Sequence, residues 1–300
     1  MSQANPPTGW TEIEEGNLQA LLRLAIPEDI GSGDLTTLAL VPESKQSKAM
    51  LVAREAGVVA GLPAAQASFL AIDPKIQWNP KCEDGQQVDP GTPLVEVSGS
   101  ARSLLIGERT ALNFLGRLSG IATQTERFVQ ETEGTNAVIL DTRKTLPGWR
   151  FLEKYAVRQG GGQNHRVGLF DGVIVKDNHL ALRADLPEAE HLTPVQLVEH
   201  LRASCPAGTF IEIEVDTLEQ FETILPAGPD AILLDNMTLE MMKTAVAVRN
   251  AEKSNVLLEA SGGVNLATVR WIAETGVDRI SVGALTHSAI QFDVALDWIS

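Results

Sequence analysis

Basic residues gather in one part of an otherwise acidic chain. The 300 residues include 24 Lys and Arg against 39 Asp and Glu, a formal net charge of −15. Arg binds carboxylate and phosphate groups through two parallel hydrogen bonds, and Lys adds a point charge. A cluster of such residues therefore predicts a substrate with several anionic groups, although a solvated surface run is the alternative. The cluster comprises Thr142, Arg143, Lys144, His165, Arg166 and Lys176.

Two carboxylates end successive predicted strands, Glu214 and Asp235. Facing a basic cluster, they could act as general acid and base, ligate magnesium, or accept hydrogen bonds from sugar hydroxyls. The alternative is a structural salt bridge to Lys176 or Arg143.

Glycines mark the ends of the last two predicted strands, at Ser261-Gly262-Gly263 and at Gly283. Glycine lets backbone N–H groups approach a phosphate, and a helix that follows adds a favourable dipole. We therefore predict a phosphate site here, with tight turns as the alternative.

The elements that would position these residues form a regular alternation after residue 136. Short apolar runs alternate with amphipathic helices, which predicts parallel βαβ units. Six or seven strands, each followed by a polar or glycine residue, favour a β/α barrel, whose active site lies at the carboxyl ends of its strands. The predicted strands are 137–140, 173–175, 210–215, 231–234, 256–258 and 279–282, and the predicted helices are 193–203, 218–225, 239–250 and 266–274.

The first hundred residues have a mixed pattern, which predicts a small α+β domain. We expect helices at 17–26 and 62–72, a strand at 49–54, and short antiparallel strands within 84–98. A long helix at 101–131 would join the two parts, with Gly116 and Gly120 as positions where it could kink or break.

Composition excludes several classes of protein. The acidic charge makes nucleic acid and anionic membranes poor partners. No apolar run approaches the roughly 18 residues of a membrane span, and residues 1–10 lack the pattern of a secretory signal. Cys82 and Cys205 have no metal-binding spacing and indicate free thiols in a reducing compartment. We therefore expect a cytoplasmic protein.

Several segments together resemble the quinolinate phosphoribosyltransferase family. The resemblance runs from about residue 17 to about residue 290. The matching segments are EDIGSGDLTT (28–37), ERTALN (108–113), DTRKT (141–145), GGQNHR (161–166), KDNH (176–179), EIEVD (212–216), LLDN (233–236) and EASGG (259–263).

The resemblance implies an incomplete α/β barrel at 119–288 and a smaller N-terminal α+β domain at 1–118, completed by the tail 289–300. It also implies a homodimer, or a higher homo-oligomer, in which Arg109 reaches the partner's active site. The reaction would join quinolinate to phosphoribosyl pyrophosphate with Mg²⁺, releasing diphosphate and carbon dioxide in NAD biosynthesis.

The resemblance also implies a role for each site residue. Glu214 and Asp235 would hold ribose hydroxyls and magnesium, and Lys144 would contact the diphosphate. Lys144, Lys176, Glu214 and Asp235 would form the catalytic set. Quinolinate and pyrophosphate oxygens would be bound by Arg143, His165, Arg166 and Lys176, and the phosphates by Ser261, Gly262, Gly283 and His287. Thr142 and Arg109 would also bind substrate.

Two other functions compete with this interpretation. A relative acting on a mono-acid such as nicotinate, or a paralogue associated with molybdenum transport, would share the fold. The combination of Arg109, Arg143, Arg166 and Lys176 favours a dicarboxylate. A non-catalytic phosphosugar-binding module would not need both Glu214 and Asp235.

Overall fold

The described residues form two compact units. The computed structural model describes residues 9–184, 187 and 191–299. The first unit contains the chain up to Arg127, the segment Lys144–Gly162 and the chain from Leu285, and the second contains Phe128–Arg143 and Gln163–Ala284. A domain boundary between residues 118 and 119 stays a prediction.

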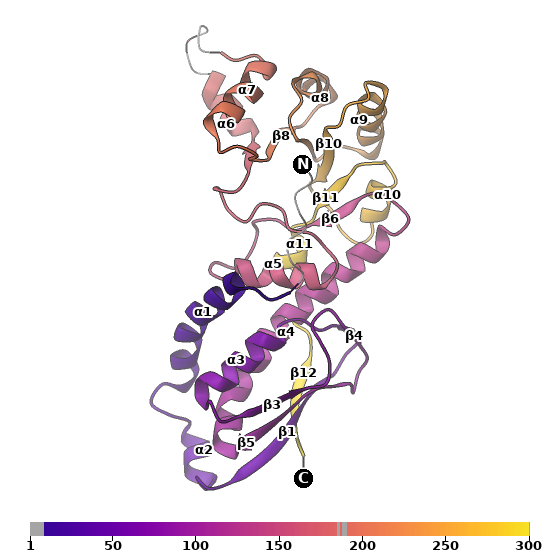
Figure 1. Ribbon diagram of the computed structural model, residues 1–300. Helices are drawn as coiled ribbons and strands as arrows, with labels where there is room; N and C mark the ends of the chain where they lie inside the picture. The colour runs from indigo at the N-terminus through magenta and orange to yellow at the C-terminus, as the bar shows by residue number, and fades with distance from the viewer. Residues whose placement is uncertain (1–8, 185–186, 188–190, 300) are drawn as a thin grey trace. The chain divides into compact units, whose positions relative to one another are not determined.

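The second unit is built on a parallel sheet of six strands (Figure 1). Their order is β6-β11-β10-β9-β8-β7. Strands next to each other in the chain are neighbours in this sheet, except that β6 and β7 form its two edges while β11 pairs with β6. This is the strand order of a β/α barrel opened between β6 and β7, which confirms the predicted α/β fold. The strands are β6 (Val138–Leu140), β7 (Val173–Val175), β8 (Ile211–Val215), β9 (Ala231–Asp235), β10 (Leu257–Ser261) and β11 (Arg279–Ser281).

Threonine N-caps start three helices of this unit. Thr193, Thr217 and Thr238 each accept a hydrogen bond from a backbone N–H three residues later, which satisfies a donor that the first helical turn leaves open. The helix predicted from residue 266 begins only at Val269, because residues 265–268 form a turn. The helices are α6 (Asp177–Ala184), α7 (Pro194–Ser204), α8 (Leu218–Ile224), α9 (Leu239–Ala251) and α10 (Val269–Ala273), with a 3-10 turn at Leu225–Ala227.

The first unit packs helices against an antiparallel sheet of order β12-β1-β5-β3 (Figure 1). Its core joins Leu51 and Val95 of the sheet to Phe69, Leu112 and Leu115 of the helices. The strands are β1 (Gln46–Ala53), β3 (Gln77–Pro80), β5 (Pro93–Ser100) and β12 (Val294–Ile299), beside the short pair β2 (Gly57–Val58) and β4 (Gln87–Val88). The helices are α1 (Glu12–Ile30), α2 (Leu35–Leu40), α3 (Leu62–Ile72), α4 (Ala101–Glu131), α5 (Arg150–Gln159) and the short α11 (Ala284–His287).

Helix α4 runs from Ala101 to Glu131 without a break, so Gly116 and Gly120 do not interrupt it. The two glycines serve close packing instead. A Cβ atom on Gly120 would lie 2.0 Å from the backbone oxygen of Ile290, and one on Gly116 would lie 2.9 Å from that of Phe292. The C-terminal segment can approach the helix because both positions lack a side chain. Among the residues that the structure describes, no helix is long and apolar enough to cross a membrane.

Candidate active site at the carboxyl ends of the parallel strands

One face of the parallel sheet is unusually polar. Side chains alternate between the two faces of a strand, so Glu212 and Glu214 of β8 share a face while Ile213 lies on the other. Register extends this face across the sheet, because Glu259 of β10 pairs directly with Arg279 of β11. The opposite face keeps the apolar residues that a helix can cover.

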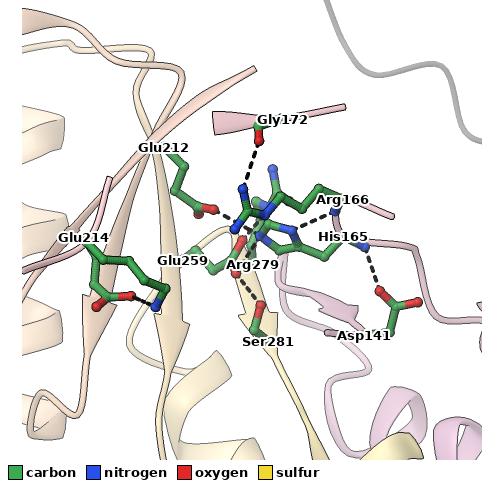
Figure 2. A network of polar contacts seen from close by, with 10 residues as sticks. Asp141, His165, Arg166, Gly172, Glu212, Glu214, Glu259, Arg279 and Ser281 are labelled. Carbon is green, nitrogen blue, oxygen red and sulfur yellow. Dashed lines mark hydrogen bonds and ion pairs between the residues drawn. The ribbon is translucent and has the colours of Figure 1, made fainter. Parts of the chain in front are cut away.

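Glu212, Glu259 and Arg279 form a buried ion cluster with His165, a role that the sequence analysis does not predict for them (Figure 2). Both carboxylates are fully buried, and Arg279 is 7% exposed. His165 Nε2 lies 2.9 Å from Glu212 Oε2 and 3.3 Å from Glu259 Oε1, and Arg279 Nε lies 2.9 Å from Glu259 Oε2. Ser281 also donates to Glu259. Buried charges of this kind persist only when they are paired.

The proton count of the cluster follows from its hydrogen bonds. The backbone N–H of Arg166 points at His165 Nδ1 at 2.7 Å, so that nitrogen accepts and the ring proton sits on Nε2. The two carboxylates raise the pKa of His165 although burial opposes this, but a second ring proton would break the Arg166 bond. Burial, together with the charge of Glu259, raises the pKa of Glu212. We therefore infer that His165 is neutral and that the Glu212 carboxyl group is protonated. The ionised Glu259 is then paired with the charged Arg279, and the cluster as a whole is neutral.

The same three groups have metal-like spacing, since ligand atoms of His165, Glu212 and Glu259 lie within 4.8 Å of one another. A protonated Nε2 cannot ligate a metal, and the guanidinium of Arg279 already supplies positive charge beside Glu259. The geometry is therefore that of a hydrogen-bonded ion cluster.

Asp141 fixes the segment that carries His165 and Arg166. This fully buried carboxylate follows β6, and it accepts hydrogen bonds from the backbone of His165 at 2.8 Å and the side chain of Asn164 at 2.7 Å. Figure 2 shows Asp141 below His165 and Arg166. Arg166 in turn donates to the backbone oxygen of Gly172 at 2.9 Å. The guanidinium of Arg166 is therefore held from both ends of its segment.

Arg143 and Arg166 act on each other electrostatically. Burial lowers the pKa of Arg166, and the positive charge of Arg143 lowers it further. Glu212 and Asp171 act in the opposite direction, and an anion bound by both guanidinium groups would favour their charged forms further. This is the feature expected of a site for a multiply charged anion.

Lys176 follows β7 and pairs with Glu214, as one of the sequence alternatives anticipated. Lys176 Nζ lies 2.5 Å from Glu214 Oε2, and the side chains are 46% and 11% exposed. Asp235 ends the neighbouring strand β9 and is half-buried. It accepts a hydrogen bond from Asn236 at 2.8 Å. Carboxylates thus lie at the carboxyl-terminal ends of the adjacent strands β8 and β9, and a lysine follows the neighbouring strand β7.

The glycines that follow β10 and β11 also lie at the carboxyl-terminal ends of the strands. Ser261 is in register with Asp235. Gly262 and Gly263 then adopt φ angles of +95° and +61°, which favour glycine. Gly283 follows β11, the next strand in the sheet. Thr142, Arg143, His165, Arg166, Lys176, Glu214, Asp235, Ser261, Gly262 and Gly283 all belong to this unit.

Three predicted site residues belong to the first unit. Arg109 is exposed on α4. Lys144 and His287 are exposed on segments joined by a hydrogen bond from Thr286 Oγ1 to the backbone oxygen of Lys144, 2.7 Å long.

An open β/α barrel with charged side chains at the carboxyl ends of its strands has the architecture of a barrel enzyme. Two family models match the chain: the quinolinate phosphoribosyl transferase N-terminal domain at residues 34–119 and the C-terminal domain at residues 121–297. The chain belongs to the quinolinate phosphoribosyl transferase family.

Individual relatives cover nearly the whole chain. A nicotinate-nucleotide pyrophosphorylase [carboxylating] of Mycobacterium leprae is 43% identical over 92% of this chain and 95% of its own length. A quinolinate phosphoribosyltransferase [decarboxylating] of Nicotiana tabacum is 38% identical over 93% of this chain and 82% of its own. The solved nicotinate-nucleotide pyrophosphorylase of Francisella tularensis superposes with a TM-score of 0.88 at 32% identity, covering 99% of this chain and 100% of that one.

Proposed function

We propose that this chain transfers the phosphoribosyl group of phosphoribosyl pyrophosphate to quinolinate and releases diphosphate and carbon dioxide. The product would be nicotinate mononucleotide, a precursor of NAD. Apart from the family, the observation that carries this proposal is that Arg143 and Arg166 belong to the same unit as Lys176 and influence each other through their charges, in a protein of net charge −15. A dicarboxylate would satisfy both guanidinium groups through charge-assisted hydrogen bonds.

In this proposal the basic residues and the glycine-containing turns bind different parts of the substrates. Arg143, Arg166 and Lys176 bind the carboxylates of quinolinate, and His165 orients the segment of Arg166 through their hydrogen bond. Thr142, the residue before Arg143, also binds substrate in this proposal. Lys144 and His287 contact the diphosphate and phosphate groups, as do the backbone N–H groups of Ser261, Gly262 and Gly283.

The reaction depends mainly on positioning and charge. The pyridine nitrogen attacks the sugar C1 as diphosphate leaves, through a transition state with positive charge on the ribose. Glu214 and Asp235 hold the ribose hydroxyls and face that charge. The positive charge of the new pyridinium nitrogen then stabilises the electron pair left on C2 when the 2-carboxylate departs as carbon dioxide, and a proton from water adds to C2 to give the product. A firm grip on the 3-carboxylate keeps that group in place.

Magnesium fits the same two carboxylates. Mg²⁺ prefers oxygen ligands and is commonly held by one or two carboxylates together with substrate phosphates. Glu214 and Asp235 supply such oxygens from adjacent, partly exposed strand ends, and they would hold the ion. Bound there with the substrate, magnesium would neutralise the charge that develops on the diphosphate.

The proposal includes a homodimer in which Arg109 completes the partner's site. Exposed leucines on α1 and α2 support association, because Leu24, Leu35 and Leu40 are 72%, 82% and 76% exposed and large apolar surfaces often mark interfaces. We also propose a cytoplasmic location. It is supported by Cys82 and Cys205, which are both free, as in most proteins of reducing compartments.

Incubation with quinolinate, phosphoribosyl pyrophosphate and Mg²⁺ tests the proposal. Mass spectrometry should detect nicotinate mononucleotide and diphosphate. In a parallel reaction, nicotinate replaces quinolinate as the specificity control. Turnover of nicotinate but not of quinolinate would show that the chain acts on a mono-acid instead.

A further inference from the structure

A buried ion pair lies in the first unit, away from the residues so far given roles. Arg117 of α4 donates from Nη2 and Nε to Glu153 Oε1 of α5, at 2.6 and 3.1 Å. The Glu153 side chain is fully buried, and that of Arg117 is 18% exposed. A buried pair adds little net stability over well-packed apolar residues, so its role is better judged from the segments that it contacts.

The pair contacts two segments that each carry a predicted phosphate-binding residue. Arg117 Nη2 donates to the backbone oxygen of Thr286 at 2.6 Å, next to His287. Glu153 Oε2 accepts from the backbone N–H of Leu146 at 3.3 Å, two residues after Lys144.

Thr286 connects the two segments directly. Its side chain is buried, and Oγ1 donates to the backbone oxygen of Lys144 at 2.7 Å. A ring of contacts therefore runs from Arg117 through Thr286 to the Lys144 segment and back through Glu153. The ring holds backbone atoms, while the side chains of Lys144 and His287 remain exposed. Fixed backbones with exposed basic tips suit a pair of residues that must present positive charge at a set separation.

We propose that Arg117, Glu153 and Thr286 are positioning residues that hold Lys144 and His287 for the phosphate groups of phosphoribosyl pyrophosphate. The inference rests on the proposed function, since Lys144 and His287 are phosphate ligands only in that reaction. None of the three positioning residues needs to touch the substrate.

Thr286→Val is the sharpest test, because valine keeps the shape and removes only the hydroxyl. Thr286→Ser restores the hydroxyl. Thr275→Val is the matched control, since Thr275 is also buried and its hydroxyl donates to the backbone oxygen of Ile272 at 2.6 Å, in the other unit. For each variant, the KM of both substrates, the Kd of inorganic diphosphate with Mg²⁺ by calorimetry, and the Tm would be measured.

Loss of one such hydrogen bond corresponds to roughly 5-fold to 10-fold in affinity. Thr286→Val should therefore raise the diphosphate Kd and the phosphoribosyl pyrophosphate KM by about that factor, with quinolinate KM unchanged. Thr286→Ser and Thr275→Val should match the wild type. Equal loss for both substrates, or diphosphate binding as tight as in the wild type, would overturn the inference.

Glu153→Gln provides a second test of the inference, because glutamine keeps the shape of the side chain and removes the negative charge that faces Arg117. It should weaken diphosphate binding more than quinolinate binding even if the Tm falls. A lower Tm with unchanged diphosphate Kd would assign the pair to stability alone and contradict the inference. Because the Kd needs no turnover, an inactive wild type would refute the proposed function separately.

Discussion

Asn236 Oδ1 occupies the space that a side chain on Gly262 would need. A Cβ atom added to Gly262 would lie 2.1 Å from Asn236 Oδ1. Asn236 itself has a φ angle of +53°, and its amide donates to Asp235 at 2.8 Å. The carboxylate that ends β9 and the glycine that follows β10 are therefore coupled through one asparagine.

Gly262→Ala should impair the site through this contact. The methyl group must displace Asn236, and the φ angle of +95° at Gly262 adds strain of about 1 kcal/mol or more. We expect kcat/KM for phosphoribosyl pyrophosphate to fall at least 10-fold in steady-state assays.

Gly263→Ala separates strain from collision. Its φ angle is also positive, +61°, but no atom lies within 4 Å of the added Cβ. It should cost less activity than Gly262→Ala, and Asn236→Gly in the Gly262→Ala background should recover part of the loss. Equal losses in the two alanine variants would exclude the contact as the cause.

Arg143→Ala should weaken quinolinate binding far more than it destabilises the fold. Hydrogen bonds to charged groups contribute about 1.5–3 kcal/mol each, so we expect the quinolinate KM to rise roughly 10-fold to 100-fold with little change in Tm. Arg202→Ala is the control, because Arg202 pairs with Asp230 on the surface. An unchanged quinolinate KM would remove Arg143 from the site.

Glu259→Gln should destabilise the second unit. Breaking a buried pair costs about 3–5 kcal/mol, since Arg279 would lose its carboxylate. Glu240→Gln is the control, because Glu240 pairs with Lys243 on an exposed helix and its loss should leave the unfolding midpoint in urea unchanged.

The cost of Glu259→Gln should also depend on pH. Burial would raise the pKa of Glu259, but the polar contacts of His165, the charge of Arg279 and the hydrogen bond from Ser281 hold it below its ordinary value of 4.5. The stabilisation is therefore present above about pH 4.5 and is lost as the pH falls below that value. Urea unfolding at pH 7, 5 and 3.5 should show the difference between wild type and variant shrinking. A constant difference would contradict this ionisation.

Asp235→Asn keeps the shape and removes the charge. It should lower turnover and raise the magnesium concentration needed for half-maximal rate, with the quinolinate KM nearly unchanged. The pyridine nitrogen carries no proton to remove, so Asp235 is not required as a general base. Asp230→Asn, at the opposite end of β9, is the control. Recovery of the Asp235→Asn rate by small external bases, at unchanged magnesium dependence, would instead indicate proton transfer.

A subunit-mixing experiment tests the proposed dimer. Arg109→Ala and Lys176→Ala should each be inactive alone, and their mixture should recover part of the activity, because one hybrid site carries neither substitution. Subunit exchange is verified by native mass spectrometry of differently tagged chains. Exchange without recovery would show that Arg109 does not act across the interface.

Much of the second unit could be predicted because its buried strands are short apolar runs between amphipathic helices. Strand β7 has its predicted bounds, and the others differ by up to a few residues at their ends. The sequence analysis does not predict helix α5. The segment is short and lies between Pro147-Gly148 and the glycines at 160–162, which are residues typical of turns and loops. Gly116 and Gly120 misled the prediction because tertiary packing, not helix propensity, decides their role.

The ion cluster was missed for a different reason. The predicted site residues follow or end strands, whereas Glu212, Glu259 and Arg279 lie within strands, where parallel sheets are usually apolar. The alternation Glu-Ile-Glu-Val at 212–215 was the available signal, because it places both carboxylates on one face. Which residues neutralise them depends on strand order, which the local sequence does not encode.

The most direct test of the whole account uses quinolinate labelled in its 2-carboxylate. With phosphoribosyl pyrophosphate and Mg²⁺, the protein should release one labelled carbon dioxide for each diphosphate and each nicotinate mononucleotide formed, and none when phosphoribosyl pyrophosphate is omitted. Diphosphate release without labelled carbon dioxide, or no product at all from the folded protein, would contradict the proposed reaction.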